Sequence, residues 1–277
     1  MCMIVPRRLC PDPGRAHDQP PSLPDWHPAT QNELNMLRTN KALFLLALCT
    51  GAVFGLSAAP AEAADITMTP VEWYALPDFC RPAILGSIYI HRVPFELRGS
   101  ATEGAKTSGG ARNASGIPGA HHFCFGLIHL SRAKRGGENY DAAVRQFNYS
   151  YQEMSGNAPM FSYVSANLGR ALYGHRKKAD AAKVWTEAIS LQPQRRESYL
   201  ALAEALLGEH RPEEALKVLK KYEDNKESDY PDAEHFLAQT YFDLKKYDEA
   251  KTHAERAYAL GYPVFGLRDR LKQLGKW

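Results

Sequence analysis

The sequence repeats its own pattern about every 34 residues, and this repetition constrains the fold more than any other feature. One alanine recurs as Ala143, Ala181, Ala215 and Ala250, at intervals of 38, 34 and 35 residues. A period of this size is typical of a unit of two helices joined by a tight turn. One such unit cannot bury its apolar face alone, so the pattern predicts a stack of units, a solenoid.

The clearest copy is Ser162–Arg195, which contains two amphipathic segments joined by a short polar turn. Gly169 and Ala181 are the small residues at the expected helix crossing, where helix axes must approach to roughly 8–10 Å. Trp185 follows on the second segment, and Pro193 ends that segment because proline cannot continue a helix. This copy predicts one helix–turn–helix unit.

Two further copies follow at Arg196–Asp229 and Pro231–Tyr262, and both repeat the aromatic, leucine and small residues of the unit. Their matching residues are Tyr199, Leu202, Ala203, Ala215 and Leu219, and then Leu237, Ala238, Tyr241, Tyr247, Ala250, Ala254 and Ala257. At these positions the chain resembles the tetratricopeptide repeat family, which implies an all-α solenoid. Two departures are Tyr222, where the family has a helix-B alanine, and Glu234, at its first aromatic position.

The repeats are expected to span residues 121–262. A first, degenerate repeat is aligned on Ala143, with a helix over 121–135 and a second helix marked by Tyr140, Ala143 and Phe147. Residues 263–277 carry leucines at helical spacing and predict the terminal helix that covers the last open face of a solenoid. The expected fold is therefore three clear repeats, one degenerate N-terminal repeat and a C-terminal capping helix.

The region before the repeats predicts an export signal. Residues 1–35 show no apolar period, and we interpret them as untranslated or disordered. Residues 36–63 combine a basic start, an apolar run and the small-x-small site Ala61-Glu62-Ala63, as in a secretory signal peptide. We favour a cleaved leader and a periplasmic or secreted protein, with no membrane span after cleavage, over a lipoprotein anchored at Cys49.

Residues 64–120 are expected to form an irregular N-terminal segment followed by a linker rich in Gly, Ser and Ala. Thr69-Pro70-Val71-Glu72 has the residues of a helix capping box. The run Ile84–Val93 is expected to be irregular or extended, packed on the helices. The stretches WYALPDFC and HHFCFGL resemble the region before the repeats in bacterial exported tetratricopeptide proteins.

Cys80 and Cys124 are the only cysteines that remain after leader removal. In an exported protein such a pair favours a disulfide. Two alternatives stay open, namely free buried thiols and a metal site shared with the neighbouring His121 and His122. We favour the disulfide, and therefore expect no metal, because structural zinc sites usually show two short-spaced ligand pairs.

Neither an enzyme nor a nucleic-acid-binding protein is indicated. The sequence contains no nucleophile elbow, phosphate-binding loop, dinucleotide fingerprint or zinc-protease motif, so we expect no catalytic residues and no cofactor. A net charge of +3 without a basic cluster does not favour nucleic acid. Nothing in the sequence fixes the oligomeric state.

The family resemblance implies a protein or peptide partner, because in that family side chains of the first helix of each repeat line a concave groove. Carried onto this chain, those positions are Ile128, Arg132, Tyr163, Arg170, Tyr173, Leu200, Glu204, Leu207, His235, Gln239 and Phe242. A mixture of aromatic, aliphatic and Arg side chains is typical of protein-binding hot spots. Arg170 and Glu204 stand where a peptide-carboxylate clamp would need asparagines, so a chaperone-tail ligand is not expected.

The sequence therefore predicts an exported scaffold or adaptor that binds a protein in its concave groove, as part of an envelope assembly or a secretion process. The competing hypothesis is a small metal-binding or redox protein that uses His121, His122, Cys124 and Cys80, with the repeats as a platform.

The leader gives a first testable prediction. We expect the exported protein to begin at or near Ala64, because the small-x-small site precedes that residue. N-terminal sequencing of the protein recovered from the periplasm checks this. A lipid-modified start at Cys49 would contradict it.

Overall fold

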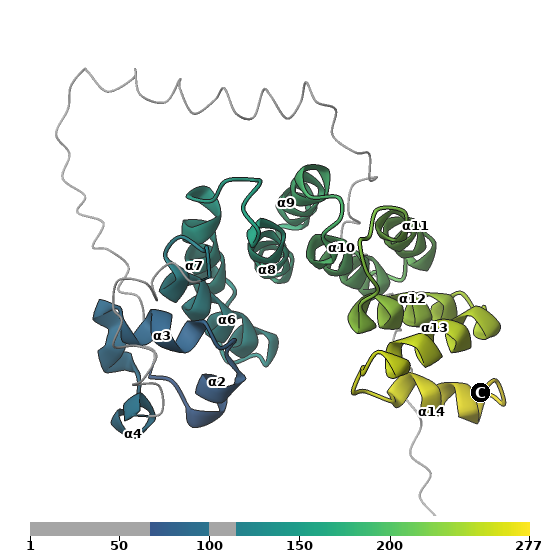
Figure 1. The fold of residues 1–277 in the computed structure, drawn as a ribbon, viewed down its shortest axis with the longest axis horizontal. Helices are drawn as coiled ribbons and strands as arrows, with labels where there is room; N and C mark the ends of the chain where they lie inside the picture. Colours follow the sequence, from purple (N-terminus) through teal and green to yellow (C-terminus); the bar gives the residue numbers. More distant parts are fainter. Residues whose placement is uncertain (1–66, 100–114) are drawn as a thin grey trace, which may run out of the picture.

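The computed structural model describes residues 67–99 and 115–277 (Figure 1). Residues 1–35, the predicted signal peptide 36–63 and most of the Gly/Ser/Ala-rich linker lie outside the described residues. The described part of the chain is helical and contains no strand. In it, no helix combines the length and the apolarity needed to span a bilayer.

Four helix pairs form the body of the molecule. They are α6 (Ala120–Lys134) with α7 (Asp141–Gln152), α8 (Phe161–Gly174) with α9 (Lys178–Leu191), α10 (Arg196–Gly208) with α11 (Pro212–Glu223), and α12 (Pro231–Asp243) with α13 (Tyr247–Ala259). The first helix of each pair also contacts the first helix of the next pair. The pairs follow one another along an arc in Figure 1, which is the predicted α-solenoid.

The ends of the solenoid are covered by shorter elements. On the N-terminal side lie α2 (Pro70–Ala75), α3 (Cys80–Leu85), the 3₁₀ helix η1 (Ile88–Arg92) and α4 (Phe95–Arg98). We call residues 67–99 the N-terminal segment. On the C-terminal side, α14 (Gly266–Gln273) packs against α13 with Leu267 and Leu271 buried, as expected for a capping helix.

The N-terminal segment is more helical than the sequence indicated. Thr69 caps α2 as expected: its hydroxyl accepts from the Glu72 N–H, and the Glu72 carboxylate accepts from the Thr69 N–H. The run 84–93, however, is neither irregular nor extended. It contains the end of α3 and the η1 helix, in which hydrogen bonds close inside short turns and need no partner strand.

The turn between paired helices uses one left-handed residue in each of the four repeats. Gly136, Arg176, His210 and Lys245 have φ values of 77°, 64°, 58° and 60°. In each case the next residue donates its N–H to a carbonyl of the preceding helix, for example Lys177 to Leu172 at 2.9 Å. This arrangement satisfies carbonyls that the helix end would otherwise leave without a donor.

Close helix packing within a pair depends on a glycine that faces an aromatic ring. A side chain at Gly169 would overlap the Trp185 ring, and one at Gly126 would overlap the Phe147 ring. Gly126 is therefore the counterpart of Gly169. The alignment on Ala143 instead equates Gly169 with Ser131, because α6 continues further beyond its glycine than α8 does and the turn at 135–140 is longer.

Substituting one glycine tests this packing. We expect Gly169→Ala to destabilise the fold by about 1–3 kcal/mol, because the added methyl group forces Trp185 out of its place. The measurement is chemical denaturation followed by circular dichroism.

Gly208→Ala is the matched control, since nothing lies within 4 Å of a side chain built there. Alanine is also the better helix former, so this variant should be neutral or slightly stabilising. Equal losses in the two variants would contradict the proposed role of Gly169.

Candidate interaction groove

An open pocket lies between the first helices of three consecutive repeats. Its volume is about 390 Å³, and α6, α8 and α10 supply its walls. The lining residues are Leu127, Leu130, Ser131, Lys134, Asn167, Arg170 and Glu204. We call this set the middle pocket. Two of the predicted groove residues, Arg170 and Glu204, are part of it.

The middle pocket carries two cations and one carboxylate. Arg170 Nε lies 2.7 Å from Glu204 Oε2, and Lys134 Nζ lies 3.6 Å from Glu204 Oε1. Partial burial acts to raise the pKa of the Glu204 carboxyl, but the charges of Arg170 and Lys134 outweigh it and lower the pKa overall. Glu204 is therefore ionised at neutral pH, and the pocket has an excess of one positive charge.

The apolar and polar walls of the pocket are also distinct. Leu127 and Leu130 come from one face of α6, where they occupy the positions that correspond to Arg170 and Tyr173 in the next repeat. On the α8 side, the Asn167 amide donates to the Tyr163 carbonyl at 2.9 Å, which fixes the amide orientation. Apolar contact and charge are thus available side by side.

The predicted groove residues of the first repeat do not face the groove. Ile128 is buried in the core. Arg132 donates to both oxygens of Glu72, at 2.7 and 2.8 Å, and to Glu138 at 3.1 Å. The prediction for these two residues was wrong because of the displaced register, and Leu127 with Leu130 takes their place.

The ion pair between Arg132 and Glu72 fastens the N-terminal segment to α6. Its hydrogen bonds lower the pKa of Glu72 to about 2. Because the pKa of Glu72 is depressed in the folded state, this pair contributes stability above the usual pKa of a glutamate. That contribution is lost as the pH falls towards 2.

The groove positions of the last repeat are covered by the chain that follows α13. His235 stacks on Tyr262 with ring centroids 4.1 Å apart, and Arg270 of α14 lies 4.6 Å from the centre of the Phe242 ring. Arg270 also hydrogen-bonds to Gln239. These three predicted residues therefore have partners within the chain.

The predicted groove residues in the middle of the chain have mixed environments. Leu200 is buried, whereas Leu207 is half-buried. Tyr163 packs on Phe123 with ring centroids 5.3 Å apart. The Tyr173 hydroxyl donates to Glu209 at 3.3 Å. Among the lining residues of the middle pocket, five are half-buried or exposed, namely Leu127, Ser131, Lys134, Arg170 and Glu204, whereas Leu130 and Asn167 are buried.

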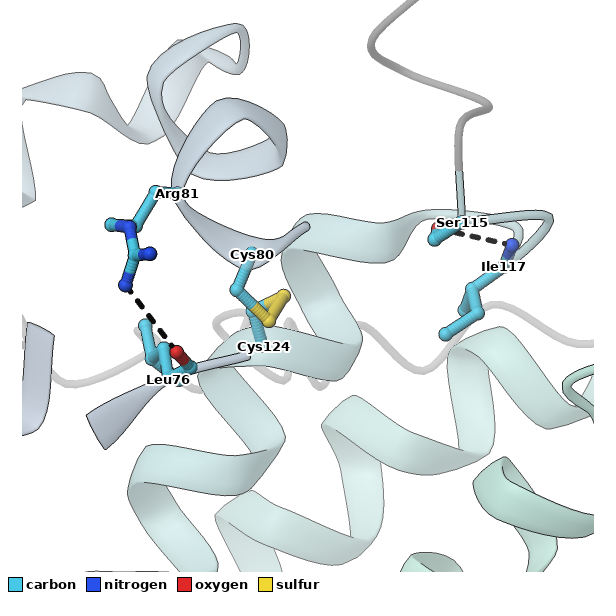
Figure 2. The surroundings of a disulfide bond; sticks show 6 residues. All are labelled: Leu76, Cys80, Arg81, Ser115, Ile117 and Cys124. Carbon is cyan, nitrogen blue, oxygen red and sulfur yellow. Dashed lines mark hydrogen bonds between the residues drawn. A yellow bond between two sulfur atoms is a disulfide. The ribbon is translucent and has the colours of Figure 1, made fainter. Parts of the chain in front are cut away.

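Figure 2 shows the link between the N-terminal segment and the first repeat. Cys80 of α3 and Cys124 of α6 are joined as a disulfide, and both residues are fully buried. Arg81 donates to the Leu76 carbonyl at 3.5 Å, next to the bridge. Since the bond uses both sulfur atoms, neither thiolate that the metal-binding hypothesis requires is present.

The histidines beside the bridge are partnered by neighbouring side chains. His121 and His122 have ring centroids 4.3 Å apart, and burial together with the charge of His122 lowers the pKa of His121 to about 4. His122 Nδ1 lies 2.7 Å from the Gln146 amide oxygen. The arrangement around His121 and His122 gives no support to the metal-binding or redox hypothesis.

Comparison with known families supports the repeat assignment. One family model, described as anaphase-promoting complex, cyclosome, subunit 3, matches residues 175–257. The matched stretch covers fewer than half of the 277 residues and runs from the end of α8 to α13. No curated protein and no solved structure matches the chain. With the stacked helix pairs, this match assigns the repeats to the tetratricopeptide type.

Loss of the disulfide should loosen the N-terminal segment. The bond spans a sequence separation of 44 residues, for which chain entropy predicts a stabilisation of about 4 kcal/mol. We expect Cys124→Ala in the chain beginning at Ala64 to lower the melting temperature, and reduction of the parent to have a similar effect.

Reduction of the double variant Cys80→Ala, Cys124→Ala is the control and should change nothing. The oxidation state is checked independently with an alkylating reagent under denaturing conditions. Reaction of two equivalents with the unreduced parent would show that the bond is absent in solution.

Proposed function

We propose that this chain is an exported, non-catalytic scaffold that binds a protein partner along the concave side of its repeats. The observation that supports this most directly is the middle pocket. It combines an apolar wall from α6 with the charged side chains of Lys134, Arg170 and Glu204. Tetratricopeptide-type repeats are also consistent with a protein-interaction role rather than with catalysis.

The binding mode that fits the pocket is the docking of a peptide helix or an extended segment into a preformed groove. Leu127 and Leu130 offer contact for an apolar side chain, while the excess positive charge favours a neighbouring acidic group. Because the groove positions of the last repeat are covered by the chain itself, the partner segment is expected to contact mainly the first three repeats, which supply the lining of the middle pocket.

Export to the periplasm is part of the proposal and rests on the leader pattern in residues 36–63. The disulfide favours the same location, since such bonds persist in oxidising compartments. The partner is therefore to be sought among envelope proteins, in an assembly or secretion process.

The test begins with affinity capture from envelope extracts, using the chain from Ala64 as bait. For the captured protein, we expect Arg170→Ala to weaken binding by at least about 1–2 kcal/mol, as for an anchor at the centre of an interface. The measurement is titration calorimetry with the purified pair. Helicity and melting temperature are compared first, to exclude a folding defect.

Lys183→Ala is the control, because Lys183 is exposed on α9, a second helix that contributes nothing to the middle pocket. It should bind like the parent. If Arg170→Ala and a second pocket variant, Leu127→Ala, both bind like the parent as well, the partner surface lies outside the middle pocket.

A further inference from the structure

Three side chains of metal-binding type meet where the third repeat joins the fourth. Glu223 is the last residue of α11, Glu234 lies in the first turn of α12, and His253 lies on α13. One possible ligand atom from each residue lies within 4.8 Å of the other two. Glu234 and His253 are buried, with 2% and 7% of their surfaces exposed.

The buried carboxylate of Glu234 is unusual for its position in the repeat. The third repeat has the fully buried ring of Tyr199 at the corresponding place. Burying a carboxylate costs free energy unless a cation or strong hydrogen-bond donor compensates it. An aromatic residue would fill the same space without that cost, so apolar packing alone does not account for Glu234.

His253 is held in a fixed orientation beside this carboxylate. Its Nδ1 lies 2.7 Å from Glu234 Oε2, and its ring stacks on Tyr241 with an angle of 16° between the planes. This hydrogen bond holds the imidazole and the carboxylate next to each other before any ion binds, and both groups are of the type that binds zinc.

We propose that Glu223, Glu234 and His253 form a zinc site that joins the third repeat to the fourth. Imidazole nitrogen and carboxylate oxygen both bind Zn²⁺, at about 2.0–2.2 Å. Two ligands of one tetrahedral zinc ion lie about 3.4 Å apart at these bond lengths. The present separation of 2.7 Å between His253 Nδ1 and Glu234 Oε2 therefore needs to increase by less than 1 Å. The proton between these two atoms leaves when zinc binds, and water supplies the fourth ligand.

Two lysines compete with the ion for these carboxylates. Lys226 Nζ lies 3.7 Å from Glu234 Oε1, but it is closer to Asp229, at 2.5 Å. Lys220 Nζ lies 2.6 Å from Glu223 Oε2, and nearly half of its side chain is exposed. Both lysines can turn towards solvent or other partners when zinc binds, so they weaken the site without blocking it.

The experiment is titration calorimetry of the tag-free, metal-stripped chain with zinc chloride, together with thermal melting with and without zinc. The parent should bind one zinc ion and melt at a higher temperature when the ion is present. Glu234→Gln and His253→Gln should each weaken zinc binding at least tenfold and abolish the zinc-dependent rise in melting temperature. Because each variant is compared with itself without metal, a general loss of stability does not affect the result.

Two further variants distinguish zinc binding at this cluster from a purely structural cluster and from zinc bound elsewhere on the chain. Lys226→Gln should bind zinc more tightly than the parent, since it removes a competing cation, whereas a purely structural role of the cluster predicts no such gain. His121→Gln alters the other place where histidines gather and should leave zinc binding unchanged. The proposal is overturned if the parent binds no zinc, if the Glu234 and His253 variants bind like the parent, or if His121→Gln removes the binding.

Discussion

The structure depends on how closely the two helices of each repeat can approach. Gly169 and Gly126 leave the space into which the rings of Trp185 and Phe147 fit, and the Trp185 indole also donates to the Ala166 carbonyl at 3.2 Å. The later repeats use Ala203 and Ala238, both fully buried, at the corresponding place. Stacking, curvature and the position of the groove all follow from this spacing, because each pair packs against the next.

Elements outside the repeats cover both ends of the solenoid. The N-terminal segment engages Arg132 through Glu72, and the C-terminal helix engages Phe242 through Arg270. A solenoid needs such covers, since an exposed terminal repeat would leave apolar surface in water. Because these end elements contact groove positions outside the middle pocket, the groove side chains open to a partner are those of the middle pocket.

The helices of the repeats could be predicted from sequence because their signals are local. Small residues at crossings, such as Gly169 and Ala181, recur at a period that one helix pair explains. The left-handed turns at Arg176, His210 and Lys245 carry no glycine to indicate them. The register of the first repeat was missed because α6 continues further beyond its glycine and the turn after it is longer. No local pattern shows whether Gly126 or Ser131 meets Phe147.

The candidate site was predictable only in part, for a related reason. Arg170 and Glu204 were expected from the repeat alignment and lie in the middle pocket, whereas Leu127, Lys134 and Asn167 were not expected. No sequence pattern near Arg132 indicates that this side chain will pair with Glu72, because the contact joins residues 60 positions apart.

That long separation has a consequence for the order of folding. Most contacts of the repeats join residues within one or two neighbouring helices, and contacts between sequence neighbours form quickly. The N-terminal segment must instead close a long loop before Glu72 reaches Arg132, which delays its docking. We infer that the repeats assemble first and that Cys80 then meets Cys124 on an already folded surface. Oxidation would thus act as the final closing step of folding.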